Sequence, residues 1–99
     1  MPTAYTIEQL KHVLVPIFQK NNINSAILFG SYSKGQATAH SDVDLLVDSG
    51  LHGLAFFGLV DDVCESLNCD VDLIDIRDLI PNSRVANEIR NTGVVIYER

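Results

Sequence analysis

The stretch AILFGSYSKGQATAHSDVDLLVD, residues 26–48, decides the fold expected for this chain of 99 residues. It opens with an apolar run that ends at Gly30, and it closes with an alternating run that carries Asp42 and Asp44. The two runs are typical of short buried strands, and glycine is typical of a turn where the backbone must approach another group closely. The pattern predicts two strands joined by a polar loop, with carboxylates at the start of the second strand.

The two aspartates of this stretch are expected on one face of a strand over residues 43–47, because alternate strand residues point the same way. Their side chains would stand about 6.6–6.8 Å apart along the chain, close enough to share two divalent ions. Mg²⁺ suits such a pair, since it takes oxygen ligands and shares them with substrate phosphates. An isolated Asp-x-Asp pair is more often a solvated strand face, so other residues have to support a metal site.

The Gly30-Ser31 turn is the second candidate component. A glycine at a strand end lets backbone N–H groups approach a phosphate, and Ser31 adds a hydroxyl donor. We expect a brief helical turn near Ser31, whose free N–H groups would favour the same anion. The alternative is an ordinary turn with Ser31 as an N-cap. The stretch is not a P-loop, since Gln36 and Ala37 follow its second glycine.

Two aspartates rarely complete a site for two metal ions, and a third carboxylate is usually needed near the group that attacks the phosphate. The run CDVDLIDI, residues 69–76, offers three aspartates. Asp70 and Asp72 share one strand face, whereas Asp75 falls on the other face with the apolar residues. Periodicity therefore removes Asp75 and leaves the choice between Asp70 and Asp72 open.

The rest of the chain alternates between helical and strand patterns. Helices are expected from Thr6, with a capping box to Gln9 and a kink or stop at Pro16, to residues 21–22, then over residues 54–67 and 84–91. Strands are expected over residues 25–29, 43–47, 70–76 and, at an edge, 94–97. This order predicts a layered α/β (α+β) domain with a small mixed sheet of about four strands and helices packed on it. Its length predicts one domain, residues 1–99.

Charge and composition narrow the partners and the location. The net charge of −6 with scattered basic residues would repel phosphate backbones, so no stable nucleic-acid binding is expected. No apolar stretch is long enough to span a bilayer, and residues 1–12 lack the pattern of a signal peptide. Cys64 and Cys69 fit neither a disulfide scaffold nor a zinc pattern, which favours reduced thiols and a cytoplasmic location.

Gly30-Ser31, ten intervening residues and then Asp42-x-Asp44 resemble the nucleotidyltransferase signature of the DNA polymerase β superfamily. LFGSYSKG, SDVDLLV and VDLID are similar to its minimal branch, the MNT proteins, over most of the chain. The resemblance implies a polymerase-β-type fold. It also implies that Asp72 is the third catalytic carboxylate, so that Asp42, Asp44 and Asp72 would all ligate metal.

Nucleotide binding would then involve Gly30, Ser31 and Lys34. Lys34 departs from the family, which usually has arginine at this position, and lysine keeps the charge but loses the bidentate fork. The alternative for Lys34 is a solvated loop lysine.

MNT proteins that resemble this chain are antitoxins paired with HEPN ribonuclease toxins. The resemblance implies Mg²⁺-dependent transfer of AMP from ATP, with two Mg²⁺ ions, to a tyrosine of a cognate HEPN toxin. Almost nothing is left beyond the catalytic core, so a partner would have to supply the acceptor. Two alternatives stay open: a non-catalytic antitoxin that neutralises its toxin by contact, and a nucleotidyltransferase that acts on a small drug or metabolite.

Overall fold

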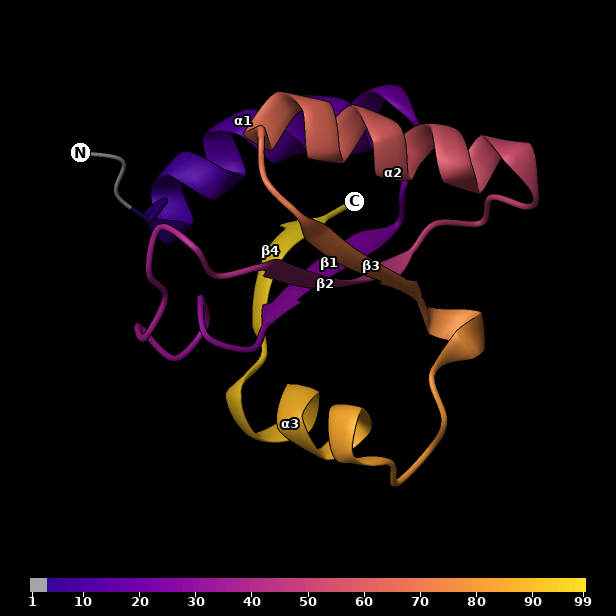
Figure 1. Cartoon of the computed structure of the whole chain (residues 1–99). Coiled ribbons are helices and arrows are strands. Elements are labelled where there is room, and N and C mark those ends of the chain that lie inside the picture. Colours follow the sequence, from indigo (N-terminus) through magenta and orange to yellow (C-terminus); the bar gives the residue numbers. More distant parts are fainter. Residues whose placement is uncertain (1–3) are drawn as a thin grey trace.

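The computed structural model describes residues 4–99, drawn in Figure 1. Residues 1–3 lie outside the described residues. The expected domain over residues 1–99 and the segment 1–12, which lacks the pattern of a signal peptide, both include them. The elements are α1 (Ile7–Lys20), β1 (Ser25–Phe29), β2 (Val43–Asp48), α2 (Leu54–Leu67), β3 (Val71–Asp75), the short 3₁₀ helix η1 (Ile76–Asp78), α3 (Arg84–Thr92) and β4 (Val94–Glu98). The longer helices and the strands expected from the sequence are thus confirmed, with ends that differ by one or two residues.

The four strands form one mixed sheet, as the sequence predicts, and their order is β3-β2-β1-β4. β1 is antiparallel to both β2 and β4, whereas β2 and β3 are parallel. The parallel pair requires a crossover, and α2 supplies it. β4 is an edge strand, also as expected.

Helices α1 and α2 lie together on one face of the sheet, and α3 lies on the other (Figure 1). The main core fills the space between the sheet and the first two helices, because the apolar stripes of the helices and the odd-numbered residues of β2 meet there. Its fully buried members include Leu10, Leu14, Phe18, Leu28, Val43, Leu45, Val47, Leu59 and Val63. Since side chains alternate along a strand, Asp42 and Asp44 project toward the face that carries α3.

Helix α1 begins with the expected capping box but does not stop at Pro16. The backbone N–H of Gln9 donates to Thr6 Oγ1 at 3.0 Å, and the N–H of Thr6 donates to Gln9 Oε1 at 2.8 Å. The helix continues through Pro16 to Lys20, so of the expected kink or stop the stop is wrong, while the C-cap at Asn21 agrees with the expected end at residues 21–22. Pro16 is exposed while Leu14 and Phe18 on either side of it are fully buried, and this burial outweighs the lost backbone hydrogen bond.

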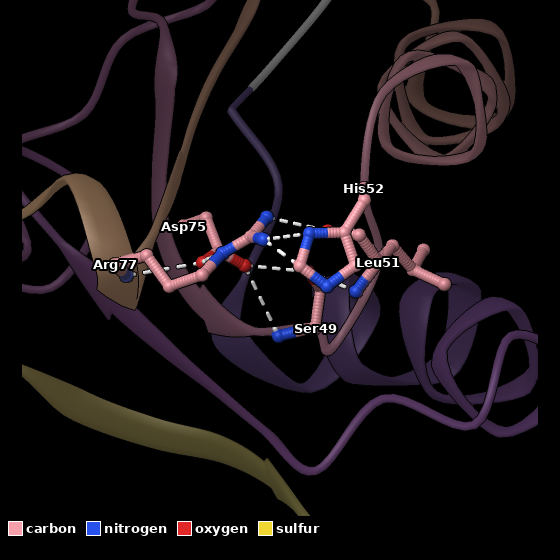
Figure 2. Close-up of polar contacts among 5 residues, drawn as sticks. All are labelled: Ser49, Leu51, His52, Asp75 and Arg77. Atoms are coloured by element: carbon pink, nitrogen blue, oxygen red, sulfur yellow. Dashed lines mark hydrogen bonds and ion pairs between the residues drawn. The ribbon is translucent and has the colours of Figure 1, made fainter.

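A polar cluster joins the carboxyl ends of the two parallel strands (Figure 2). Asp75, at the end of β3, is 1% exposed and accepts hydrogen bonds from the N–H and hydroxyl of Ser49, which follows β2. Arg77 donates to the same carboxylate through Nε at 2.7 Å, and it also contacts His52 and the carbonyl of Leu51. The cluster therefore fastens the loop after β2 to η1.

The charge state of Asp75 follows from these contacts. Burial alone would raise the pKa of its carboxyl, but the hydrogen bonds from Ser49 and Arg77 outweigh burial and lower the pKa to about 2. Asp75 is thus a structural carboxylate, which agrees with its exclusion from the candidate site on strand periodicity.

Among residues 4–99, no helix is both long and apolar enough to cross a membrane.

Candidate active site

Three chain segments meet at one end of the sheet: the end of β1, the start of β2 and the start of β3. In the antiparallel pair, Phe29 of β1 lies opposite Asp44 of β2. In the parallel pair, Asp44 lies opposite Asp72 of β3. Asp44 is therefore flanked by the end of β1, which leads into Gly30, and by the carboxylate-bearing start of β3. The Asp75 cluster lies at the other end of β2 and β3.

Gly30 makes room for the carboxylate of Asp44. A Cβ added to Gly30 would lie 2.2 Å from Asp44 Oδ2, far inside van der Waals contact. The φ angle of Gly30 is also +75°, in the region that residues with a side chain rarely adopt. The glycine of the sequence motif is therefore required both by the turn and by the acid that it faces.

Negative charges converge on Asp44. Burial and, after it, the negative charges of Asp72, Asp42 and Glu88 together raise the pKa of its carboxyl to about 6. Carboxylates gathered in this way repel one another unless a cation lies among them. The pKa of Asp44 thus supports the prediction that Asp42, Asp44 and Asp72 share one site.

The donor set of this site consists of carboxylate oxygens, the ligands that Mg²⁺ prefers. Within residues 4–99, no three side chains of His, Cys, Asp or Glu already form a group that could hold a metal ion. Mg²⁺ is usually held by one or two carboxylates together with waters and substrate phosphates, and not by an all-protein cage. The residues therefore fit a Mg²⁺ ion that binds together with a triphosphate.

The segment after Gly30 forms hydrogen-bonded turns at the place where the sequence predicts a brief helical turn, and no regular helix follows. The N–H of Lys34 donates to the carbonyl of Gly30 at 3.3 Å, and the N–H of Gln36 donates to that of Ser31 at 2.9 Å. Ser33 Oγ donates to the Gly30 carbonyl at 2.8 Å. Gly35, with a φ of +71°, ends the helical path. Ser31 is half-buried and adjoins the site directly.

Lys34 forms an ion pair that sequence reasoning missed. Its Nζ lies 2.9 Å from Oε1 of Glu88, a residue of α3. No local pattern could have identified Glu88, because it occupies an ordinary helical position far along the chain from the motif. Only the packing of α3 on the carboxylate face brings it near Asp44.

The strand register distinguishes the two aspartates that periodicity left open. Asp72 lies directly opposite Asp44, whereas Asp70 precedes β3; both residues are exposed, so the register alone separates them. The backbone carbonyl of Asp70 accepts a hydrogen bond from the N–H of Val43 at 3.1 Å, which holds the start of the strand pair together. The geometry is thus the one that the family resemblance implies for Asp72.

Comparisons with known proteins agree with this fold. Residues 12–99 match the family described as "Polymerase beta, Nucleotidyltransferase". A Methanocaldococcus jannaschii protein named "Putative protein adenylyltransferase" is 31% identical over 87 residues, which cover 83% of this chain and 92% of that protein.

Solved structures show the same architecture. A chain in a crystal structure of a toxin–antitoxin with AMP-PNP superposes with a TM-score of 0.73 and 26% identity, over 90% of this chain and 73% of that one. A chain in a structure of tri-AMPylated Shewanella oneidensis HEPN toxin in complex with MNT antitoxin has a TM-score of 0.69 over 95% and 74% of the two chains. Its 23% identity establishes likeness of fold alone.

The mixed sheet, the glycine turn and the carboxylates on one face define an enzyme of the nucleotidyltransferase class. The match over residues 12–99 identifies it further: the chain belongs to the polymerase β nucleotidyltransferase family. The resemblance read from the Gly-Ser and Asp-x-Asp motifs is therefore confirmed.

Proposed function

We propose that this chain is a Mg²⁺-dependent protein adenylyltransferase that transfers AMP from ATP to a hydroxyl, a tyrosine in our proposal, of a cognate HEPN-type toxin. It would act as an antitoxin, in the cytoplasm and as one nucleotidyltransferase domain over residues 1–99. The observation that carries the proposal is that Gly30, which directly follows β1, faces Asp44 of β2, and that Asp44 lies opposite Asp72 of β3. The name of the Methanocaldococcus jannaschii relative supports a protein acceptor, and the toxin–antitoxin structure with AMP-PNP supports a toxin as the partner.

The proposed roles follow from the position of each residue. The Gly30-Ser31 turn would bind the triphosphate through backbone N–H groups and the serine hydroxyl. Asp42 and Asp44 would hold Mg²⁺ against the phosphates, and Asp72 would ligate one ion and orient the acceptor hydroxyl. Bound Mg²⁺ would neutralise charge that develops on the phosphates and on the leaving group.

The bonds exchanged in this reaction are few. The acceptor oxygen would form a bond to the α-phosphorus while the bond from that phosphorus to the bridging oxygen of the β-phosphate breaks. Asp72 would accept the hydroxyl proton, and pyrophosphate would leave. The products are an adenylylated side chain and pyrophosphate.

Surface charge supports a protein acceptor over a nucleic acid. The chain carries a net charge of −6, which disfavours contact with phosphate backbones and suits a basic protein surface. Cys64 and Cys69 are both free, as a reducing compartment would keep them.

The test is transfer of adenylate to the partner that copurifies with this chain. With ATP and Mg²⁺, intact-mass measurement should detect one or more adenylate additions on the partner. Asp42→Asn, Asp44→Asn and Asp72→Asn should each slow the transfer by about 100-fold or more, because each would remove a metal ligand or the proton acceptor.

Two matched controls sharpen this test. Asp48→Asn changes an aspartate on the same strand and face as Asp44, and Asp70→Asn changes the other aspartate of the β3 run; both should leave transfer within about twofold, as surface substitutions away from special features usually do. Loss of transfer in Asp70→Asn with retention in Asp72→Asn would reverse the assignment of the third carboxylate. Toxin neutralisation that survives Asp44→Asn would instead favour inhibition by contact.

A further inference from the structure

The ion pair between Lys34 and Glu88 links the loop after β1 to α3, two segments that are distant in the sequence. Lys34 Nζ and Glu88 Oε1 are 2.9 Å apart, and the two side chains are 36% and 28% exposed. Lys34 belongs to the turn that begins at Gly30, the segment to which we assign triphosphate binding, and its N–H donates to the carbonyl of Gly30. The ammonium of Lys34 is therefore already paired with the carboxylate of Glu88.

Glu88 is held firmly on the carboxylate face. Ser83 caps α3 by accepting a hydrogen bond from the N–H of Ala86 at 3.2 Å. At the other end of α3, a Cβ on Gly93 would lie 2.9 Å from Cγ2 of Ile27, so the chain packs tightly on β1 there. Glu88, between these two anchors, adds a negative charge to those of Asp42, Asp44 and Asp72.

We propose that Glu88 is a positioning residue that competes with the nucleotide phosphates for the ammonium of Lys34 and thereby sets the affinity for ATP. The inference rests on the proposed function only in that nucleotide binds at the Gly30-Ser31 turn. Lys34 is a single point charge, so it interacts less strongly with either anion when both claim it. A triphosphate carries more charge than one carboxylate and displaces Glu88, at the cost of the ion pair.

A metal-binding role for Glu88 predicts the opposite result. If Glu88 held Mg²⁺, removal of its charge would weaken the binding of Mg²⁺ and ATP. If Glu88 competes for Lys34, removal of its charge strengthens ATP binding, because Lys34 no longer breaks an ion pair when nucleotide arrives. The direction of the change in Kd therefore separates the two roles.

The experiment is a double-mutant cycle of ATP binding in Mg²⁺, measured by isothermal titration calorimetry on the unchanged chain, Glu88→Gln, Lys34→Gln and the double variant. Glu88→Gln should lower the Kd about threefold or more, the size expected for an exposed ion pair together with relieved repulsion. In the Lys34→Gln variant, adding Glu88→Gln should lower the Kd by about twofold or less, because no ion pair is then broken.

Salt and a matched control test the electrostatic origin. The effect of Glu88→Gln should shrink as ionic strength rises, since partly exposed charges are screened. Glu65→Gln, on the exposed side of α2 across the sheet, should leave the Kd unchanged. Thermal unfolding of each variant checks folding, and Glu88→Ala provides a second variant with the same expected direction.

The outcomes are decisive for Glu88. A Kd that rises or stays the same in Glu88→Gln overturns the inference, and so does equal tightening on both Lys34 backgrounds, which would mean repulsion without competition. If the unchanged chain binds ATP, these results concern Glu88 alone and leave the proposed function standing. If it binds no ATP in Mg²⁺, both the proposed function and this inference fail.

Discussion

Gly30 is required both by the backbone conformation of its turn and by the carboxylate of Asp44 that it faces. We expect Gly30→Ala to lower the free energy of unfolding by about 2 kcal/mol, because Ala at a φ of +75° is strained and its Cβ would displace the carboxylate of Asp44. Transfer should be lost as well, since the displaced acid could no longer hold its position. Urea denaturation and the adenylate transfer assay measure the two effects.

Gly35 offers a matched control for that substitution. Its φ angle is +71°, but a Cβ there would meet nothing within 4 Å. Gly35→Ala should therefore cost only the backbone strain, about 1 kcal/mol, and should retain transfer. Equal losses in the two variants would contradict the role given to the contact between Gly30 and Asp44.

Asp44 should be costly to the stability of the metal-free protein. Because burial and, after it, the charges of Asp72, Asp42 and Glu88 disfavour its ionised form, Asp44→Asn should raise the free energy of unfolding at pH 7 by about 1 kcal/mol in EDTA, a value discounted for partial exposure. The same variant should lose transfer. Chemical denaturation with Asp48→Asn as the control tests this, and a destabilised Asp44→Asn would refute the repulsion.

The candidate site residues that belong to a local motif can be recognised in the sequence, whereas Glu88 cannot. Gly30, Ser31, Asp42 and Asp44 are recognisable because a turn glycine and a strand period of two leave a local pattern. Glu88 has no such local pattern, since only the packing of α3 brings it next to Lys34. Tertiary proximity of this kind has no local signature.

At the scale of elements, the parallel pairing of β2 and β3 places Asp72 beside Asp44. The sequence alone predicts both strands and the mixed sheet, because a short polar loop separates the first two strands and a helix separates the next two. It could not choose between Asp70 and Asp72, because that choice depends on the pairing register. The family resemblance implies the role of Asp72, and the register that places it opposite Asp44 is visible only in the sheet.

The carboxyl ends of these two strands depend on Asp75, and this dependence sets a response to acid. The folded pKa of about 2 lies below the ordinary value of about 3.9, so the fold favours the ionised form. Its contribution to stability is complete above about pH 4 and is lost as the pH falls through about 2. Asp75→Asn should therefore destabilise the protein by about 1–2 kcal/mol at pH 7 and by much less near pH 2.

Asp78→Asn is the control for this pH dependence, because Asp78 is exposed on η1 close to Arg77 in the chain. The measurement is the free energy of unfolding in urea at a series of pH values. A constant difference between Asp75→Asn and the unchanged chain from pH 7 to pH 2 would show that the charge of Asp75 is not the cause.

At the scale of the whole molecule, ligand binding should be visible as stability. Mg²⁺ and ATP at about ten times their Kd should add about 1.4 kcal/mol to the folded state, which corresponds to a Tm increase of several degrees for a domain of this size. Differential scanning calorimetry should detect the shift. Asp44→Asn should abolish it, whereas Asp48→Asn should retain it; a full shift in Asp44→Asn would remove Asp44 from the nucleotide site.

Most of the architecture follows from hydrophobic periodicity, because α1, α2 and the buried faces of the strands form one continuous core. The arrangement of α3 does not follow from it. Only Ala86 of this helix is buried, and the apolar positions Val85, Ala86 and Ile89 mark the side of the helix that packs but not the face of the sheet that it covers. Helix α3, whose place on the sheet the pattern does not predict, brings the negative charge of Glu88 to the candidate site.

The two polar groups at opposite ends of β2 and β3 have an evolutionary consequence. The candidate catalytic acids lie at the start of the strands, while the Ser49–Asp75–Arg77 cluster secures their far end. Selection can therefore alter one group without disturbing the other. A lineage that lost its catalytic acids would still inherit a folded scaffold, free to be retained for whatever contacts its surface already makes.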